Sequence, residues 1–174
     1  MTILADFQIR QLMSRQPPLA EPFDESLLNP CSLDCLLGDE IIIESAQTPE
    51  MNTKLSIAAY TKEDPYLLKP GQFILATTRE VWNIPDNLAA MFMLKSSRAR
   101  EGLEHLHAGF IDSGWHGSTL TLELSNVRQI HPIPLWPGMK IGQLVFHTMD
   151  EIPLNPYWKV GRYNNDKGAT ASKG

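Results

Sequence analysis

The stretch LKSSRAREGL, residues 94–103, gathers Lys95, Arg98 and Arg100 around two adjacent serines in a chain whose formal net charge is −5. It follows the apolar run LAAMFML, and its first serine could cap a helix, so we expect one helical turn after a strand. A helix N-terminus offers free N–H groups and a partial positive charge. The pattern indicates a small-anion site such as a polyphosphate would fill. A capped turn with solvated arginines is the alternative.

A lone carboxylate lies in the strand-like stretch STLTLELSN, residues 118–126. Alternation along a strand puts Leu120, Leu122 and Leu124 on one face and Glu123 on the other. Facing solvent, this carboxylate would be unremarkable. Facing a cleft, it would be a candidate general base.

The stretch HAGFIDSGWHG, residues 107–117, places Asp112 between an apolar strand end and a Gly-Trp turn. An aspartate there often makes only an Asx turn, and Trp115 suits either a core or a stacking surface. His105 and His107 lie two residues apart. With no third ligand evident, we expect no metal site.

Composition narrows the class of protein. A chain of 174 residues with 43% hydrophobic and 20% charged residues fits one globular domain. Its pI of about 5.5 argues against a general binder of polymeric nucleic acid. No apolar run approaches the roughly 20 residues that span a bilayer, and no signal peptide is recognised, so we expect a cytoplasmic protein without a membrane partner. Cys31 and Cys35 are expected to be plain buried thiols.

The order of apolar runs indicates the fold. Residues 5–16 carry apolar side chains at helical spacing, which predicts a short N-terminal helix. Five short runs separated by turn signals predict strands at 40–45, 73–82, 88–94, 118–127 and 140–149. We therefore expect an all-β barrel or jelly-roll-like sandwich over residues 1–160. The polar stretch 161–174 is expected to be a mobile tail.

Taken in order, six stretches resemble the dCTP deaminase family of the dUTPase superfamily. They are NPCSLDCLLGD (29–39), KSSRAREGL (95–103), AGFIDSGW (108–115), LTLELSN (120–126), PGMKIGQLVF (137–146) and GRYNNDKGATAS (161–172). The resemblance implies a distorted β-barrel that assembles as a homotrimer, with each active site built between subunits and a C-terminal tail that closes over a nucleotide.

The same resemblance implies roles for individual residues. Glu123 falls on the catalytic carboxylate that activates water at C4 of cytosine, Arg100 on a phosphate-binding and catalytic-support position, and Asp112 on the receptor of the deoxyribose 3′-hydroxyl. The implied nucleotide-binding residues are Lys95, Ser96, Ser97, Arg100, Ala108, Asp112, Trp115, Tyr157, Arg162 and Asp166. The family works without zinc, and Mg²⁺ accompanies the triphosphate with no direct protein ligand.

Several residues depart from the family pattern. Lys95 and Leu36 stand where arginines are usual, Arg162 stands for a lysine and Asp166 for a glutamine. One extra residue between Asp112 and Glu123 suggests a bulge.

The pair Gly109-Phe110 resembles the Gly-Trp of bifunctional members that also release pyrophosphate. The sequence favours dCTP deamination. It leaves open a bifunctional enzyme that forms dUMP, a dUTPase-only enzyme and a non-catalytic nucleotide-binding regulator.

Overall fold

A single curled sheet of ten strands dominates the computed structural model, which describes residues 2–48 and 50–174. The helices are α1 (Asp6–Met13), α2 (Ser96–Arg100), α3 (Tyr157–Val160) and the 3-10 turn η1 (Glu25–Leu27). The first six strands are β1 (Ala20–Glu21), β2 (Leu28–Asn29), β3 (Ser32–Glu44), β4 (Met51–Ser56), β5 (Tyr66–Leu68) and β6 (Phe73–Asn83). The remaining strands are β7 (Leu88–Leu94), β8 (Leu103–His105), β9 (Phe110–Ile111), β10 (His116–Asn126), β11 (Ile133–Leu135) and β12 (Lys140–Thr148).

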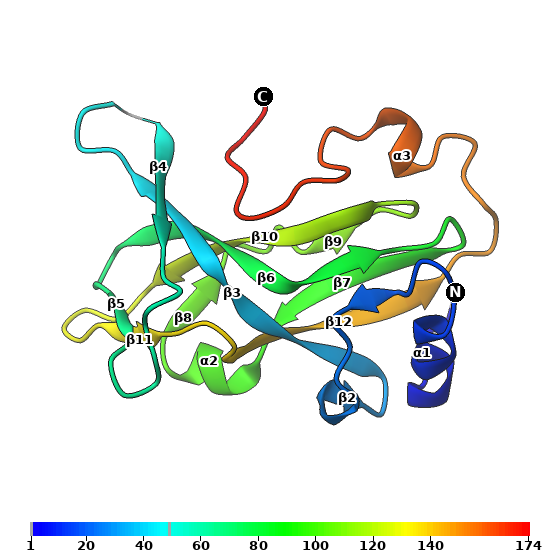
Figure 1. Cartoon of the computed structure of the whole chain (residues 1–174), viewed down its shortest axis with the longest axis horizontal. Helices are drawn as coiled ribbons and strands as arrows, with labels where there is room; N and C mark the ends of the chain where they lie inside the picture. Colours follow the sequence, from blue (N-terminus) through cyan, green and yellow to red (C-terminus); the bar gives the residue numbers. More distant parts are fainter. Residues whose placement is uncertain (1, 49) are drawn as a thin grey trace.

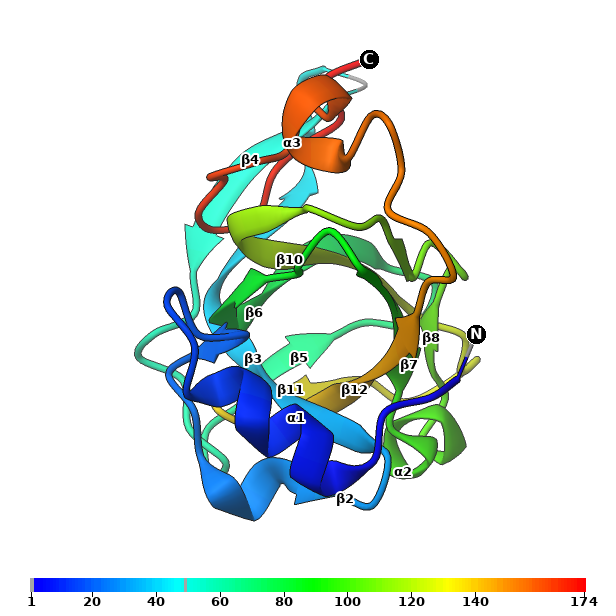
Figure 2. The ribbon, with the colours of Figure 1, turned by 90° about the vertical axis from the view of Figure 1, so that its right-hand side faces the viewer.

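The main sheet runs in the order β8-β10-β6-β3-β12-β7-β9, with β1 paired to β6, and β2 and β4 paired to β3. A separate ribbon joins β11 to β5. Figure 1 shows β3 crossing the whole molecule, and Figure 2, turned by 90°, shows the strands curling into a ring. The expected distorted, mainly β barrel is confirmed.

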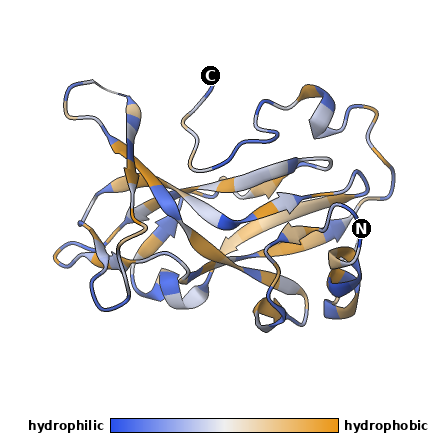
Figure 3. Ribbon diagram, viewed as in Figure 1, coloured by the Kyte–Doolittle hydropathy of each residue, from blue (hydrophilic) through white to orange (hydrophobic). Residues whose placement is uncertain are grey.

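The core fills the inside of this ring. Trp82 of β6 and Phe146 of β12 are fully buried, and their rings lie 6.4 Å apart. In Figure 3 the strands carry long hydrophobic stretches interrupted by hydrophilic residues, whereas much of the loop chain is hydrophilic. Burying each large apolar side chain contributes roughly 1.5–3 kcal/mol to stability, so this interior fixes the frame that carries the site.

Four of the five predicted strands agree closely with the structure. β6, β7, β10 and β12 match the predicted strands to within two residues, and the helix expected over 5–16 is confined to Asp6–Met13. β3 begins eight residues before the predicted strand, because nearly all of its first half is buried and lacks alternation. Cys35 is buried but Cys31 is exposed, so the prediction of two buried thiols was wrong for Cys31.

Two described acidic side chains, Asp34 of β3 and Glu80 of β6, are enclosed in this frame. Glu80 of β6 is 2% exposed, and both of its carboxylate oxygens accept from the Leu36 N–H, at 3.3 and 3.1 Å. Burial raises the pKa of this carboxyl from 4.5 to about 7, and the Leu36 hydrogen bond opposes the rise. The folded chain therefore holds a proton here that the unfolded chain releases near pH 4.5.

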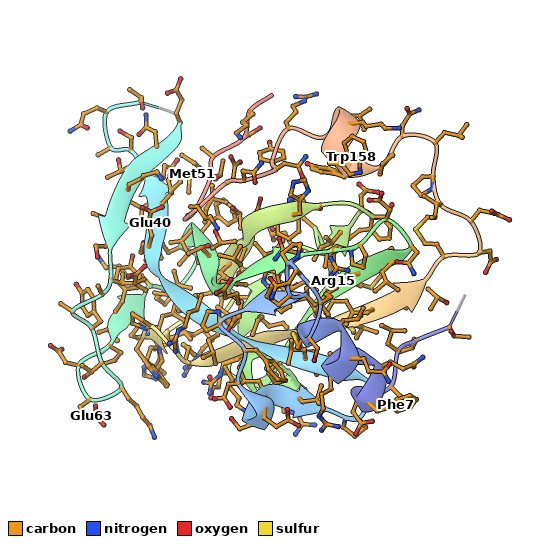
Figure 4. The ribbon with its side chains drawn as sticks, turned by 45° about the vertical axis from the view of Figure 1, so that its right-hand side comes forward. Phe7, Arg15, Glu40, Met51, Glu63 and Trp158 are labelled. Atoms are coloured by element: carbon orange, nitrogen blue, oxygen red, sulfur yellow. The ribbon has the colours of Figure 1, made fainter. Side chains whose placement is uncertain are left out.

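We expect Glu80→Gln to stabilise the fold at high pH only. Between pH 4.5 and 7 the folded state binds more protons than the unfolded state, so rising pH lowers the free energy of unfolding across that window. Glutamine removes the buried charge, and the gain at pH 8 should be roughly 2–3 kcal/mol, with little change at pH 4.5. Urea unfolding at both pH values measures it. The exposed Glu63, labelled on its loop in Figure 4, gives the matched control Glu63→Gln. Equal gains at both pH values would contradict the assignment.

Candidate active site

A pocket of about 580 Å³ lies between the outer face of β10 and the C-terminal tail. Its walls come from β4, β6, the segment around β9, β10, α3 and the tail. The lining residues are Met51, Phe73, Leu75, Ala108, Phe110, Ile111, Asp112, Trp115, Thr119, Leu120, Thr121, Glu123, Tyr157, Tyr163, Asp166, Thr170 and Ser172. Six of the residues singled out in the sequence lie here: Ala108, Asp112, Trp115, Glu123, Tyr157 and Asp166.

Strand alternation places the carboxylate in this pocket. Leu122 and Leu124 are fully buried on the barrel side of β10, whereas Thr121 and Glu123 line the pocket. The Glu123 side chain keeps 27% of its surface exposed. Of the two orientations that the sequence left open for Glu123, the structure shows the one in which it lines a pocket.

A histidine approaches this carboxylate from the neighbouring strand. His105 Nε2 lies 3.2 Å from Glu123 Oε2, and the His105 side chain is 5% exposed. The contact lacks the direction of a regular hydrogen bond, and neither buried atom has a hydrogen-bond partner elsewhere in the described chain. Sequence reasoning weighed His105 only as a metal ligand and missed this contact, because β8 is three residues long and was not predicted.

Asp112 and Trp115 form the rim of the pocket. Asp112 is exposed, and no described residue donates a hydrogen bond to its carboxylate, so it does not cap the turn as an Asx residue would. The Trp115 indole N–H donates to the Tyr163 carbonyl at 3.0 Å, and the side chain is 6% exposed. Trp115 thus packs in the core and also supports the tail.

The extra residue between Asp112 and Glu123 is absorbed in β10. Pairing with β6 shifts register between His116 and Ser118 and again between Thr119 and Thr121. Gly117 takes a φ of +68°, which favours glycine. The expected bulge is present, and it lets Glu123 keep its place opposite Leu75.

The tail is held along the pocket by hydrogen bonds to β10 and β3. The Thr119 N–H donates to the Asp166 carbonyl at 3.0 Å, and the Thr170 N–H to Thr121 Oγ1 at 3.1 Å. Ala169 is fully buried, and its N–H donates to Glu40 Oε1 at 2.9 Å. Figure 4 labels Glu40 and Met51 on the two strands beside this part of the tail. The stretch expected to be mobile is docked in this structure.

Asp166, the tail residue that stands where the family usually has a glutamine, has a cation beside it. Asp166 Oδ2 lies 2.6 Å from Lys173 Nζ, which also donates to the Arg162 carbonyl at 2.9 Å. The Lys173 ammonium lies 5.0 Å from the centre of the Tyr163 ring. Lys173 was not singled out from the sequence, and it neutralises the charge of Asp166 within the chain. The Arg162 side chain is exposed and does not line the pocket.

The predicted phosphate residues of α2 lie elsewhere. Lys95, Ser96, Ser97 and Arg100 are absent from the pocket lining, and Figures 1 and 2 both show α2 on the opposite side of the barrel from the tail and α3. The residue preceding α2 is Lys95, and no side chain caps the helix, so the prediction of a serine cap was wrong. Within one described chain, the pocket gathers Glu123, Asp112 and the other predicted residues near them. It does not include the residues that were predicted to bind the phosphates.

Lys95 is tied to a buried acid. Its ammonium lies 2.8 Å from Oδ1 of Asp34, which is 2% exposed, and Lys140 Nζ lies 3.2 Å from Oδ2. Asn29 donates to the same Asp34 oxygen as Lys95 at 2.7 Å. Two ammonium groups share one carboxylate, so a positive charge remains beside α2.

Within the described ranges, no group of three or more histidine, cysteine, aspartate or glutamate side chains is arranged to hold a metal ion. His107, 95% exposed, lies 3.7 Å from Glu104 at the surface and does not join His105. None of the described helices is both long enough and apolar enough to cross a membrane.

Comparison with known proteins assigns the family. Residues 3–149 match a family model described as dCTP deaminase-like. The chain is 38% identical over 182 residues to a Streptomyces coelicolor protein named "dCTP deaminase, dUMP-forming", covering 98% of this chain and 94% of the relative. A protein of the same name from Methanosphaerula palustris is 41% identical over 179 residues, covering 98% and 95%.

A solved structure shares the fold. The crystal structure of 2′-deoxycytidine 5′-triphosphate deaminase from Agrobacterium tumefaciens superposes with a TM-score of 0.68 at 21% identity, covering 84% of this chain and 48% of that one. The chain thus spans about half the length of that structure, but nearly all of the curated relatives. A family match over most of the chain, relatives of about 40% identity and a shared fold agree: the chain belongs to the dCTP deaminase-like family.

Proposed function

We propose that this protein deaminates dCTP and cleaves the product to dUMP and pyrophosphate. The observation that carries the proposal is the Glu123 carboxylate, which projects from an apolar strand into a pocket of about 580 Å³. The curated relatives are named dUMP-forming, which favours the bifunctional alternative over deamination alone.

In the deamination step, Glu123 takes a proton from water as the water oxygen bonds to C4 of cytosine. That proton then passes to the exocyclic nitrogen, the remaining proton of the added water moves to N3 as C4=O forms, the C4–N4 bond breaks, and ammonia leaves a uracil ring. Water is a poor nucleophile at neutral pH, and a positioned carboxylate contributes typically 10²–10⁴-fold to such a step. Apolar walls from Phe73, Leu75 and Trp115 exclude bulk water from the ring.

In the second step, a water molecule attacks the α-phosphorus, the bond to the bridging oxygen breaks, and pyrophosphate leaves. Asp112 is an exposed pocket carboxylate to which no described residue donates a hydrogen bond, which suits it to contact the sugar or to orient this water. Gly109 supports the open loop beside it: a Cβ at that position would lie 2.5 Å from the Phe92 carbonyl oxygen. Any side chain at this position would force the loop away from β7.

The phosphate-binding half of the site is proposed to come from a second copy of the chain. Ser96, Ser97 and Arg100 are exposed and lie away from the pocket, so a single chain leaves the site incomplete. Met91 and Met93 of β7 and Phe110 of the neighbouring β9 are exposed at 41%, 50% and 65%, and burying such side chains favours association. A homotrimer with intersubunit sites satisfies both observations.

Mg²⁺ is proposed to enter with the triphosphate. The described pocket holds no cluster of acidic ligands for it, so the phosphates would be its principal ligands. The ion would offset phosphate charge, while Arg100 and the α2 serines of this chain hold the phosphate oxygens. The proposed location is cytoplasmic, where nucleoside triphosphates are abundant.

The docked tail is proposed to act as a lid that opens for the nucleotide. Its contacts are mostly single hydrogen bonds, and one buried alanine anchors it, so opening costs less than unfolding any core strand. Because Lys173 neutralises Asp166, the carboxylate is no reason to favour a regulator that has lost turnover.

Glu123→Gln should bind dCTP but lose ammonia release. Glutamine keeps the size and the acceptor oxygen of the side chain but cannot take the proton, so deamination should fall at least roughly 100-fold. Ammonia and pyrophosphate are followed separately, and calorimetry checks binding. Pyrophosphate release from dUTP, which needs no proton acceptor at C4, is the internal control. Near-normal ammonia release would mean that Glu123 is not the base.

Two inactive variants should restore activity when co-expressed. If α2 of one copy completes the pocket of another, Arg100→Ala and Glu123→Gln chains mixed at random leave about one quarter of the trimer's sites with both halves intact. Each variant alone should be inactive. Arg100→Ala mixed with a chain carrying both changes is the control, because no intact α2 is then present. Lack of recovery in a confirmed mixed trimer would place both halves in one chain.

Lys173→Met should loosen the tail. Loss of a partly exposed ion pair costs about 0–1 kcal/mol, so amide exchange of residues 164–174 should speed up by up to about fivefold. The neighbouring exposed Lys167 provides the control Lys167→Met. Hydrogen exchange measured by mass spectrometry reads the difference. Equal exchange in the two variants would show that the Lys173–Asp166 pair does not hold the tail.

A further inference from the structure

We propose that His105 is a positioning residue, which holds one oxygen of Glu123 so that the other faces the reacting water. The inference rests on the proposed deamination and assigns a role to a residue on a different strand from the base. His105 belongs to β8, and Glu123 belongs to β10.

The two facing atoms have no other hydrogen-bond partner in the described structure. His105 Nε2 and Glu123 Oε2 are both buried, both lack a hydrogen bond, and lie 3.2 Å apart. A buried polar atom without a partner is costly, so two such atoms at hydrogen-bonding distance favour one shared bond. A small rotation of either side chain aligns the two atoms for a hydrogen bond. Oε1, the other carboxylate oxygen, is not among these enclosed atoms.

The imidazole is held in place independently of Glu123. Its ring packs against the Phe92 ring, with centroids 4.6 Å apart and planes inclined by 50°. His105 pairs with Leu124 across the β8–β10 ladder, one residue from Glu123. The Leu106 N–H also approaches the Glu123 carbonyl at 3.4 Å. The ring and the carboxylate thus share one rigid frame, as positioning requires.

The chemistry fits a donor that keeps its proton. A neutral imidazole with hydrogen on Nε2 donates to Glu123 Oε2, while Oε1 takes the proton from water and returns it to the leaving nitrogen. The proton on His105 is not transferred, so the balance of the deamination is unchanged. Losing the donor frees the carboxylate to rotate, which lowers the rate while leaving the nucleotide contacts intact.

Other charged groups do not compete for His105. Glu104 and His107, from the same segment, face each other at the surface at 3.7 Å. Arg98 of α2, the helix packed beside β8, pairs with Glu101 at 2.6 Å. Glu123 is the one carboxylate that the described structure places against the imidazole.

Three variants test the role. His105→Phe keeps an aromatic ring against Phe92 but removes the donor, His105→Gln keeps a donor, and His107→Asn is the control at an exposed position with a φ of +59°, which asparagine tolerates. We expect His105→Phe to lower kcat for ammonia release roughly 10- to 100-fold with an unchanged Kd for dCTP. His105→Gln should recover part of that loss, and His107→Asn should behave as wild type.

A readout independent of activity is the ¹⁵N chemical shift of the imidazole. In the full-length protein, His105 should show hydrogen on Nε2, and Glu123→Gln should change that signal. A normal kcat in His105→Phe, or an imidazole signal indifferent to Glu123→Gln, would overturn the inference while leaving the proposed function standing. Wild-type protein that releases no ammonia from dCTP would overturn the proposed function itself, and the inference with it. If His105→Phe does not fold, His105→Gln and the NMR signal decide.

Discussion

The site depends on the alternation of side chains along β10. Leu122 and Leu124 enter the barrel and are fully buried, so the residue between them must point outward. A slip of one residue would bury Glu123 and expose two leucines, which is unfavourable on both counts. Hydrophobic burial, rather than any contact of the carboxylate itself, therefore fixes the position of Glu123. The bulges near Thr119 take up the extra residue of this chain without disturbing that register.

Charged groups follow a second constraint, because each enclosed acid must be paired or neutral. Asp34 is enclosed with Lys95 and Lys140, and Asp166 lies beside Lys173. Glu80 forms no ion pair with a described lysine or arginine, and burial raises its pKa to about 7 although the neighbouring Arg79 charge opposes the rise. The same rule applies to the tail: the Asp166 carboxylate is tolerable among the proposed nucleotide-binding residues because Lys173 of the same chain offsets its charge. The surplus charge of Lys95 and Lys140 remains on the side where phosphates are proposed to bind.

The sequence predicted those parts of the structure that depend on residues close together along the chain. Alternation in STLTLELSN predicted both the strand and the exposure of Glu123, because one face of β10 is buried and the other is not. It missed the first half of β3, which is enclosed on both faces, and β8, whose three residues are too few to show a period. The contact of His105 with Glu123 joins two strands, so no pattern along the chain reveals it. The resemblance to a family implied that each site is built between subunits, and within one chain α2 and Glu123 lie apart.

That separation follows from the topology. β7 leads into α2 on one side of the barrel, and the chain must then return through β8 before β10 brings Glu123 to the other side. Moving α2 to the pocket of its own chain would require breaking the β7–β12 ladder, seven paired residues long, at the barrel wall. Supplying α2 from a second copy breaks no ladder and covers the exposed Met91, Met93 and Phe110 as well. Association is therefore the less costly way for this fold to place cations beside its carboxylate, and the proposed chemistry would be conditional on that assembly.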